Sequence, residues 1–164
     1  IARHQTINDI FVRALAAADM PSTKEPNRLS LSDNKHPDGL TLLPWSGGKS
    51  LTWDVTVICP LAESYLHISR NTSAGAAELA ATRKTDKYAS LLNTYIFQPL
   101  AFESLGTMNE CAISFISDLG HMISSKSHDE REAHFLFQRL AITLQRFNAV
   151  LLHESFHALD IPDK

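Results

Sequence analysis

The sequence predicts a mixed α/β (or α+β) domain in which helices pack on a small mixed sheet that contains a β-hairpin. Three observations support this fold class: an amphipathic helical pattern near the start of the chain, two β-rich segments around a Gly-Gly turn, and further helical patterns interrupted by one strand-like segment. With 164 residues, we expect positions 1–164 to form a single domain. The expected elements, in chain order, are a helix at 5–19, a hairpin at 40–59, a helix at 74–92, a strand at 94–103, and helices at 107–124 and 132–158.

The first helix is indicated by apolar residues at spacings of three and four, namely Ile7, Ile10, Phe11, Ala14, Leu15 and Ala18. Asn8, Asp9 and Arg13 fall between them and are expected to face solvent. Pro21 ends the helix, because it cannot donate the next helical hydrogen bond. The polar residues 21–38 predict a long loop.

The hairpin consists of the segments LTLLPW and LTWDVTVIC on either side of SGGK. The second segment, 51–59, is apolar or β-branched at nearly every position, which predicts a strand buried on both faces and covered by helices. Residues 60–73 are expected to be irregular. The Ala-rich residues 74–92 favour a helix, and Pro99 places the strand at 94–103 at an edge or a bulge.

Composition and charge narrow the function classes. The net charge of −3 is unusual for a dedicated nucleic-acid-binding domain, although a local basic cluster can still bind phosphate. No apolar run is long enough to cross a bilayer, so no membrane partner is expected. Cys59 and Cys111 are expected to be buried free thiols in a reducing, intracellular compartment. Because the chain does not begin with Met, we expect it to be a fragment of a larger polypeptide.

Two aspartates on the hairpin form the main candidate site. Asp38 stands at the entrance of the first strand, and Asp54 lies in the middle of the second, where an isolated carboxylate is costly unless it is neutral, paired or metal-bound. Together they would suit Mg²⁺ or Mn²⁺, which could polarise a phosphate and lower the pKa of an attacking water. The alternative is that Asp38 belongs to a Pro-Asp-Gly turn and Asp54 pairs with an arginine.

This metal site depends on the register of the hairpin. A two-residue turn at Gly47-Gly48 with regular pairing would place Asp38 opposite Val57 and the two aspartates on opposite faces. A three-residue turn, or one bulge, would bring them to the same face. A nuclease function requires the second arrangement.

Basic residues follow on the predicted helix at 74–92. Lys84 and Lys87 are three residues apart and share a face, beside Arg83 and Tyr88. A lysine near two metal-binding carboxylates can stabilise charge on a phosphate, whereas the ordinary role of such a segment is a solvated helix face.

The chain resembles the PD-(D/E)xK nucleases, and more closely the restriction-endonuclease-like domain at the C-terminal end of non-LTR retrotransposon and reverse-transcriptase-like proteins. The resemblance covers nearly the whole chain and rests on the stretches RHQTINDIFVRAL, HPDGLTLLPW, LTWDVTV, RKTDKYASL, FQPLAFESLG and FLFQRLAITLQRFNAV. It implies a restriction-endonuclease-like core and a Mg²⁺- or Mn²⁺-dependent endonuclease that nicks target DNA in the nucleus. The remainder of a reverse-transcriptase polyprotein would be its partner.

The resemblance also implies roles for individual residues. Asp38 and Asp54 would be the two acids of the motif, and Lys84 or Lys87 would be its lysine, moved to the following helix because Thr56 occupies the usual place. Glu103 is a candidate third metal ligand. His36 stands where the family often has Arg or Lys. A zinc knuckle would lie upstream of Arg3 and His4, but without its cysteines His4 cannot build a zinc site.

Two further signals lead to different functions. His153, Glu154 and His157 match H-E-x-x-H on a predicted helix, which would make the protein a zinc hydrolase. Arg139 and Arg146 lie seven residues apart on the last helix; with Arg83 and Tyr88 they are candidates for nucleic-acid contact, although a solvated face is the simpler role. The other alternative is a catalytically inactive nucleic-acid-binding or scaffold remnant of a retroelement protein.

Overall fold

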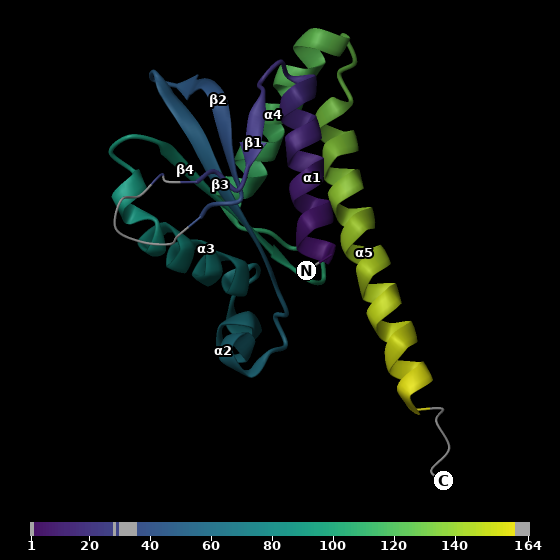
Figure 1. Cartoon of the computed structure of the whole chain (residues 1–164). Coiled ribbons are helices and arrows are strands. Elements are labelled where there is room, and N and C mark those ends of the chain that lie inside the picture. The colour runs from purple at the N-terminus through teal and green to yellow at the C-terminus, as the bar shows by residue number, and fades with distance from the viewer. Residues whose placement is uncertain (1, 28, 30–35, 160–164) are drawn as a thin grey trace.

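A four-stranded mixed sheet forms the centre of the chain in the computed structural model, which describes residues 2–27, 29 and 36–159, the side chains of 157–159 excepted (Figure 1). The strand order is β1-β2-β3-β4, with β1, β2 and β3 antiparallel and β4 parallel to β3. The strands are β1 (Ser22–Lys24), β2 (Gly39–Ser46), β3 (Lys49–Ile58) and β4 (Ile96–Glu103).

Helices cover both faces of this sheet. One face packs on α1 and α4, and α5 lies against those two helices; the other face packs on α3 (Figure 1). The C-terminal part of α5 continues past the start of α1. The helices are α1 (Ala2–Ala17), α2 (Glu63–Asn71), α3 (Gly75–Lys87), the short 3₁₀ helix η1 (Ala89–Leu91), α4 (Glu110–Ser127) and α5 (Glu132–Leu159). The mixed α/β class and the hairpin are therefore confirmed.

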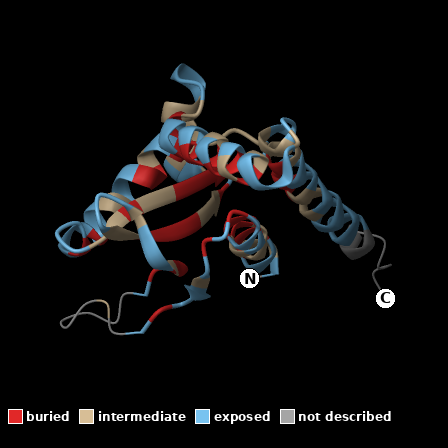
Figure 2. Cartoon of the chain, turned by 90° about the horizontal axis from the view of Figure 1, so that it is seen from above, coloured by how far each residue is buried: buried red, intermediate tan, exposed pale blue. Residues whose placement is uncertain are grey.

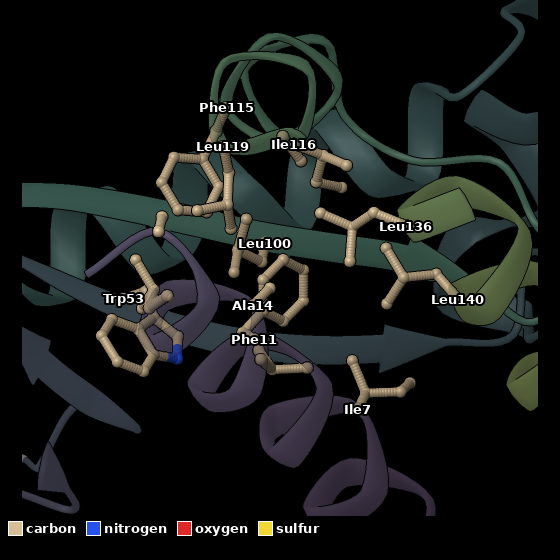
Figure 3. Close-up of a cluster of buried hydrophobic side chains, with 14 of the residues drawn as sticks. Ile7, Phe11, Ala14, Trp53, Leu100, Phe115, Ile116, Leu119, Leu136 and Leu140 are labelled. Atoms are coloured by element: carbon tan, nitrogen blue, oxygen red, sulfur yellow. The ribbon is translucent and has the colours of Figure 1, made fainter. Parts of the chain in front are cut away.

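The main core lies between the sheet and α1, α4 and α5 (Figure 3). Phe11 of α1 packs between Phe102 of β4 and Phe115 of α4, with ring centroids 6.2 Å apart in both pairs. Burial follows the strands and the inward sides of the helices, while the C-terminal part of α5 is largely exposed (Figure 2). Burying these large side chains drives folding and fixes α1 against the sheet.

Alternation along β3 separates the two faces. Leu51, Trp53 and Val55 enter the main core, whereas Ile58 packs on the alanines of α3. Residues 51–55 are all buried, so this part of β3 is covered on both faces as predicted. Asp54 faces the α3 side because side chains alternate along a strand.

Several expectations need correction. Residues 60–73 were expected to be irregular but contain α2, a nine-residue helix with no fully buried residue. Its inward side is short, because only Tyr65 and Ile68 pack on the core cluster beside α3. The expected loop at 21–38 contains β1, a three-residue strand held by its pairing with β2. Pro99 lies on β4, at the edge of the sheet, as predicted.

Single residues also differ from expectation. Asn8 is buried rather than solvent-facing, because its amide bridges two other groups: it accepts a hydrogen bond from Trp53 Nε1 (2.7 Å) and donates one to the Asp38 carbonyl (3.2 Å). Cys59 and Cys111 are free thiols but exposed, since one follows the end of β3 and the other lies in the first turn of α4. Among the described residues, no helix has the length and apolar character that a membrane span requires.

Candidate functional site

The register of the hairpin brings Asp38 and Asp54 to one face. A two-residue turn at Gly47 and Gly48, both with positive φ, pairs Ser46 with Lys49. Between that pair and the pair Gly39–Trp53, β2 uses seven residue steps and β3 four, because two register shifts intervene. Because side chains alternate between the two faces of a sheet, an odd number of extra residues in β2 moves Asp38 to the face opposite the one that regular pairing would give it.

Asp38 precedes Gly39 and Asp54 follows Trp53, so the pairing register leads directly to the two aspartates. Both side chains line one pocket of about 460 Å³. The arrangement that the nuclease function requires is thus present. It arises from bulges within β2 and not from a longer turn.

Asp38 is held by contacts from two elements. Its Oδ2 accepts a hydrogen bond from the Val55 amide at 2.6 Å and lies 2.9 Å from His4 Nε2 of α1. The Asp38 amide donates to the Trp53 carbonyl at 2.9 Å. The Asp38 contact raises the pKa of His4 above its usual value, because the carboxylate favours the imidazolium form.

Asp54 is the most deeply buried acid of the pocket, with its side chain 5% exposed. Its Oδ2 lies 2.7 Å from Lys84 Nζ, and its Oδ1 accepts a hydrogen bond from the Tyr88 hydroxyl at 3.3 Å. Burial and the nearby Asp38 charge raise the pKa of Asp54, and Lys84 and Lys87 act in the opposite direction. A pocket acid with a pKa raised in this way is typical of a functional site.

The basic residues of α3 divide into two groups. Lys84 and Lys87 line the pocket, and Lys87 Nζ lies 5.1 Å from the centre of the Tyr88 ring. Arg83 points elsewhere: its guanidinium group packs on the Tyr65 ring at 5.5 Å and donates to the Tyr65 hydroxyl at 3.3 Å. The structure therefore places both lysines beside the acids and leaves Arg83 outside this pocket.

Tyr88 has a positioning role in this geometry. Its ring is buried and packs on Phe97 at 4.9 Å, so little of the ring is available to stack on a base. Its hydroxyl has the His36 carbonyl at 3.1 Å and Asp54 Oδ1 at 3.3 Å, so its one proton is shared between these two acceptors. Burial and the nearby acids raise the pKa of Tyr88, so the hydroxyl remains protonated and can donate.

Glu103 is not part of the pocket. Glu103 pairs in register with Ile58 of β3. Ile58 is four residues from Asp54, so the two acids are separated by roughly 13 Å along the strand direction. Its Oε1 accepts a hydrogen bond from the Ala77 amide (3.2 Å), so the carboxylate caps the first turn of α3. In the part of the chain that the structure describes, no group of three or more His, Cys, Asp or Glu side chains is arranged to hold a metal ion.

Three groups that complete the pocket have no site role in the sequence pattern. His4 and Arg3 reach it because the packing of α1 sets where its first turn lies. Thr56 Oγ1 is buried in the pocket wall without a hydrogen-bond partner. Arg3, Lys84 and Lys87 outnumber Asp38 and Asp54 around the pocket, so it is locally basic within an acidic chain.

The other predicted residues lie on α5. Arg139 and Arg146 line a separate groove against α1. The segment containing His153 and Glu154 is helical, as predicted, and both residues are exposed. The side chain of His157 lies outside the described residues, so the H-E-x-x-H match stays a prediction.

Comparisons with protein-family models and with curated protein sequences give no match for this chain.

Proposed function

We propose that this domain is a divalent-metal-dependent DNA endonuclease with a restriction-endonuclease-like core. The observation that carries the proposal is the meeting of Asp38, Asp54 and Lys84 in one pocket, from three separate stretches of the chain. Two acids beside an amine at the end of a hairpin are the parts that phosphodiester hydrolysis with a hard metal ion needs.

The order of elements supports the finer fold assignment. A helix, three strands in antiparallel succession, the helices α2 and α3 with the short η1, and a parallel strand follow one another along the chain. This is a small mixed sheet with a hairpin flanked by helices, as the resemblance to PD-(D/E)xK nucleases implies. Fold alone does not establish activity, so the proposal depends on the residues of the pocket.

The donor set suits Mg²⁺ or Mn²⁺. Magnesium ions in phosphate-processing sites are commonly held by one or two carboxylates and retain several waters, so a third protein acid is not required. Asp38 and Asp54 would hold the ion, and the buried Thr56 hydroxyl offers a partner for one of its waters. When bound, the ion would supply Lewis-acid stabilisation of the phosphate and a water of lowered pKa.

The remaining residues act on the acids and on the substrate. The Val55 amide and His4 orient the Asp38 carboxylate, and Tyr88 orients Asp54. Lys84 stabilises negative charge that develops at the scissile phosphate, because it is the amine in contact with Asp54. Lys87 lies at the same pocket wall and binds a neighbouring phosphate oxygen.

The biological setting of the proposal rests on the resemblance to retroelement nuclease domains. In that setting the domain nicks chromosomal DNA in the nucleus, and the 3′ end primes reverse transcription. Its partners are target DNA and the remainder of a reverse-transcriptase polyprotein.

Nicking of supercoiled plasmid tests the activity. The wild-type chain should convert the plasmid to open circles in Mg²⁺ or Mn²⁺ but not in EDTA, and Asp54→Asn should abolish the conversion. Asp86→Asn is the matched control, because Asp86 is an exposed acid of α3 outside the pocket. Equal nicking by Asp54→Asn and the wild type would exclude the proposed site, and no nicking by either would favour the inactive remnant.

A further inference from the structure

A groove of about 370 Å³ lies between α1 and α5, apart from the acidic pair. Its basic residues are Arg13 of α1 and Arg139 and Arg146 of α5, all three of them exposed. Asp9 is the acidic residue in its wall, and it forms an ion pair with Lys24. The groove therefore has a positive excess although the whole chain carries a net charge of −3.

The three arginines lack acidic partners in the part of the chain that the structure describes. Elsewhere on the surface, Lys126 pairs with Asp19 and Arg131 with Asp129. Arg70 and Arg83 are also exposed without an acidic partner among the described residues, but neither lines this groove. Gathering three unpaired guanidinium groups in one groove costs electrostatic free energy, and a bound anion would offset that cost.

The spacing of the arginines favours a polymeric anion over a small one. Arg139 and Arg146 are seven residues apart on α5, which separates them by about 10.5 Å along the helix axis. One strand of a DNA duplex advances about 3.4 Å per phosphate, so a backbone lying along the groove would present phosphates to both. Guanidinium groups bind phosphate oxygens in bidentate geometry.

The groove is connected to the candidate active site along the start of α1. Arg3 lines the pocket of Asp38 and Asp54 and also a hollow beside Phe147 of α5. Thr6, one turn further along α1, and Arg146, next to Phe147, line the groove. From Arg3 to Arg13 the path is about 15 Å long, or about four base pairs of duplex.

We infer that the groove between α1 and α5 binds the phosphodiester backbone of DNA next to the site of cleavage. A polymer crossing from the pocket would meet Arg3 first and the three groove arginines next, so one ligand accounts for both basic regions. The position relative to cleavage rests on the proposed nuclease function, whereas backbone binding by the groove does not.

The test compares two triple variants in equilibrium binding to a fluorescent 30-base-pair duplex in Ca²⁺ over a series of salt concentrations. The first replaces Arg13, Arg139 and Arg146 with Gln. The second, matched in charge, makes Lys49→Gln, Arg70→Gln and Lys126→Gln, at positions outside both the pocket and the groove. Thermal melting followed by circular dichroism checks that both variants are folded.

The groove variant should bind more than about tenfold more weakly than the control at 0.1 M salt. Its slope of log K against log salt should be smaller by about 2 to 3, because each lost phosphate contact removes about 0.9. Equal affinities and slopes for the two variants would overturn the inference. Displacement of the DNA by poly-glutamate at equal charge, or tighter binding of an RNA duplex of the same sequence, would overturn it as well.

Plasmid nicking in Mg²⁺, measured beside this binding experiment, separates the inference from the proposed activity. If the wild type binds DNA through these arginines but does not nick plasmid in Mg²⁺, the groove assignment stands and the nuclease proposal fails. If it nicks plasmid and the groove variant binds and nicks like the control, the nuclease proposal stands and the groove assignment fails.

Discussion

The ammonium group of Lys84 lies 2.7 Å from Oδ2 of Asp54, one residue beyond the Gly39–Trp53 pair of β2 and β3. Because β2 begins at Gly39, the β3 edge is open at this level, and Asp38 uses that opening to accept a hydrogen bond from the Val55 amide. The site therefore lies where the antiparallel ladder ends and α3 crosses the sheet. Lys84 offsets part of the cost of burying a carboxylate there.

Asp54→Asn should make the metal-free protein more stable at neutral pH. Burial and Asp38 raise the folded-state pKa of Asp54 above its unfolded value. The folded state therefore binds the Asp54 proton more tightly than the unfolded state does. The stability that this proton contributes is fully present below the ordinary aspartate pKa and is lost as pH rises through the raised pKa. Asparagine lacks the charge, so the variant keeps its stability above that window.

Urea unfolding between pH 4 and 8 in EDTA measures this difference. The free energy of unfolding of the wild type, relative to Asp54→Asn, should fall as pH increases, and Asp86→Asn should follow the wild type. Added Mg²⁺ should stabilise the wild type but not Asp54→Asn, since binding to the folded state alone shifts the equilibrium. If the difference in the free energy of unfolding between the wild type and Asp54→Asn did not change with pH, the raised pKa of Asp54 would be contradicted.

Lys84 and Lys87 should differ in their contribution to nicking. Lys84→Met removes the amine next to Asp54 and should lower the single-turnover nicking rate by about 10²- to 10³-fold, the usual cost of losing one preorganised donor to developing charge. Lys87→Met should mainly weaken binding of the plasmid, with a smaller effect on the rate at saturation.

Rates at saturating enzyme, compared with Lys126→Met on α4, separate these two effects. A Lys87→Met rate as low as that of Lys84→Met would assign the catalytic role to both lysines. A Lys84→Met rate equal to the control would remove the amine from the proposed mechanism.

The predictability of the fold differs between strong and weak patterns. The helical stripe around Phe11 and Leu15 and the hairpin around Gly47 depend on local periodicity and turn chemistry, and the structure confirms both. Helix α2 is short and turns only Tyr65 and Ile68 toward the core, so its local signal covers a single turn. Strand β1 has three residues and is held by its pairing with β2. Tertiary pairing decides such elements, and a single sequence does not reveal it.

The same division applies to the site. Asp54 was conspicuous because an acid inside an apolar strand needs an explanation. Whether Asp54 meets Asp38 depends on bulges in β2 that the sequence does not specify. Within the bulged part, the Thr41 hydroxyl accepts a hydrogen bond from the Leu51 amide (2.9 Å) in place of a backbone carbonyl. His4 could not be placed in the pocket from the sequence alone because its position follows from how α1 packs.

Asn8→Ala should destabilise the domain by about 1 to 3 kcal/mol, because it leaves the buried indole Nε1–H of Trp53 without an acceptor. The Asp38 carbonyl loses one of its two donors and keeps the Glu25 amide (3.0 Å), so the position of Asp38 is less well fixed and nicking should fall together with stability. Gln5→Ala, on an exposed position of the same helix, should change stability by less than about 0.5 kcal/mol. Chemical denaturation of the three proteins measures these values, and an Asn8→Ala value matching that of Gln5→Ala would show that Trp53 finds another partner.

Glu103 offers a contrast with Asp54, because both acids are buried on β-strands but only one lines the pocket. Glu103→Gln keeps an amide oxygen that can accept from the Ala77 amide. It should therefore leave both stability and metal-dependent nicking near wild-type values. Glu103→Ala removes the acceptor at the start of α3 and should cost about 0.5 to 2 kcal/mol.

The comparison of Glu103→Gln with Asp54→Asn isolates the role of charge, since each replaces a carboxylate by an amide of nearly the same shape. A metal ligand loses its function in that exchange, whereas a helix cap retains it. Nicking rates across a Mg²⁺ titration should give the same half-saturating concentration for Glu103→Gln and the wild type. A large increase in that concentration would show that Glu103 approaches the ion when substrate is bound, and α3 would then have to shift its first turn to release Ala77.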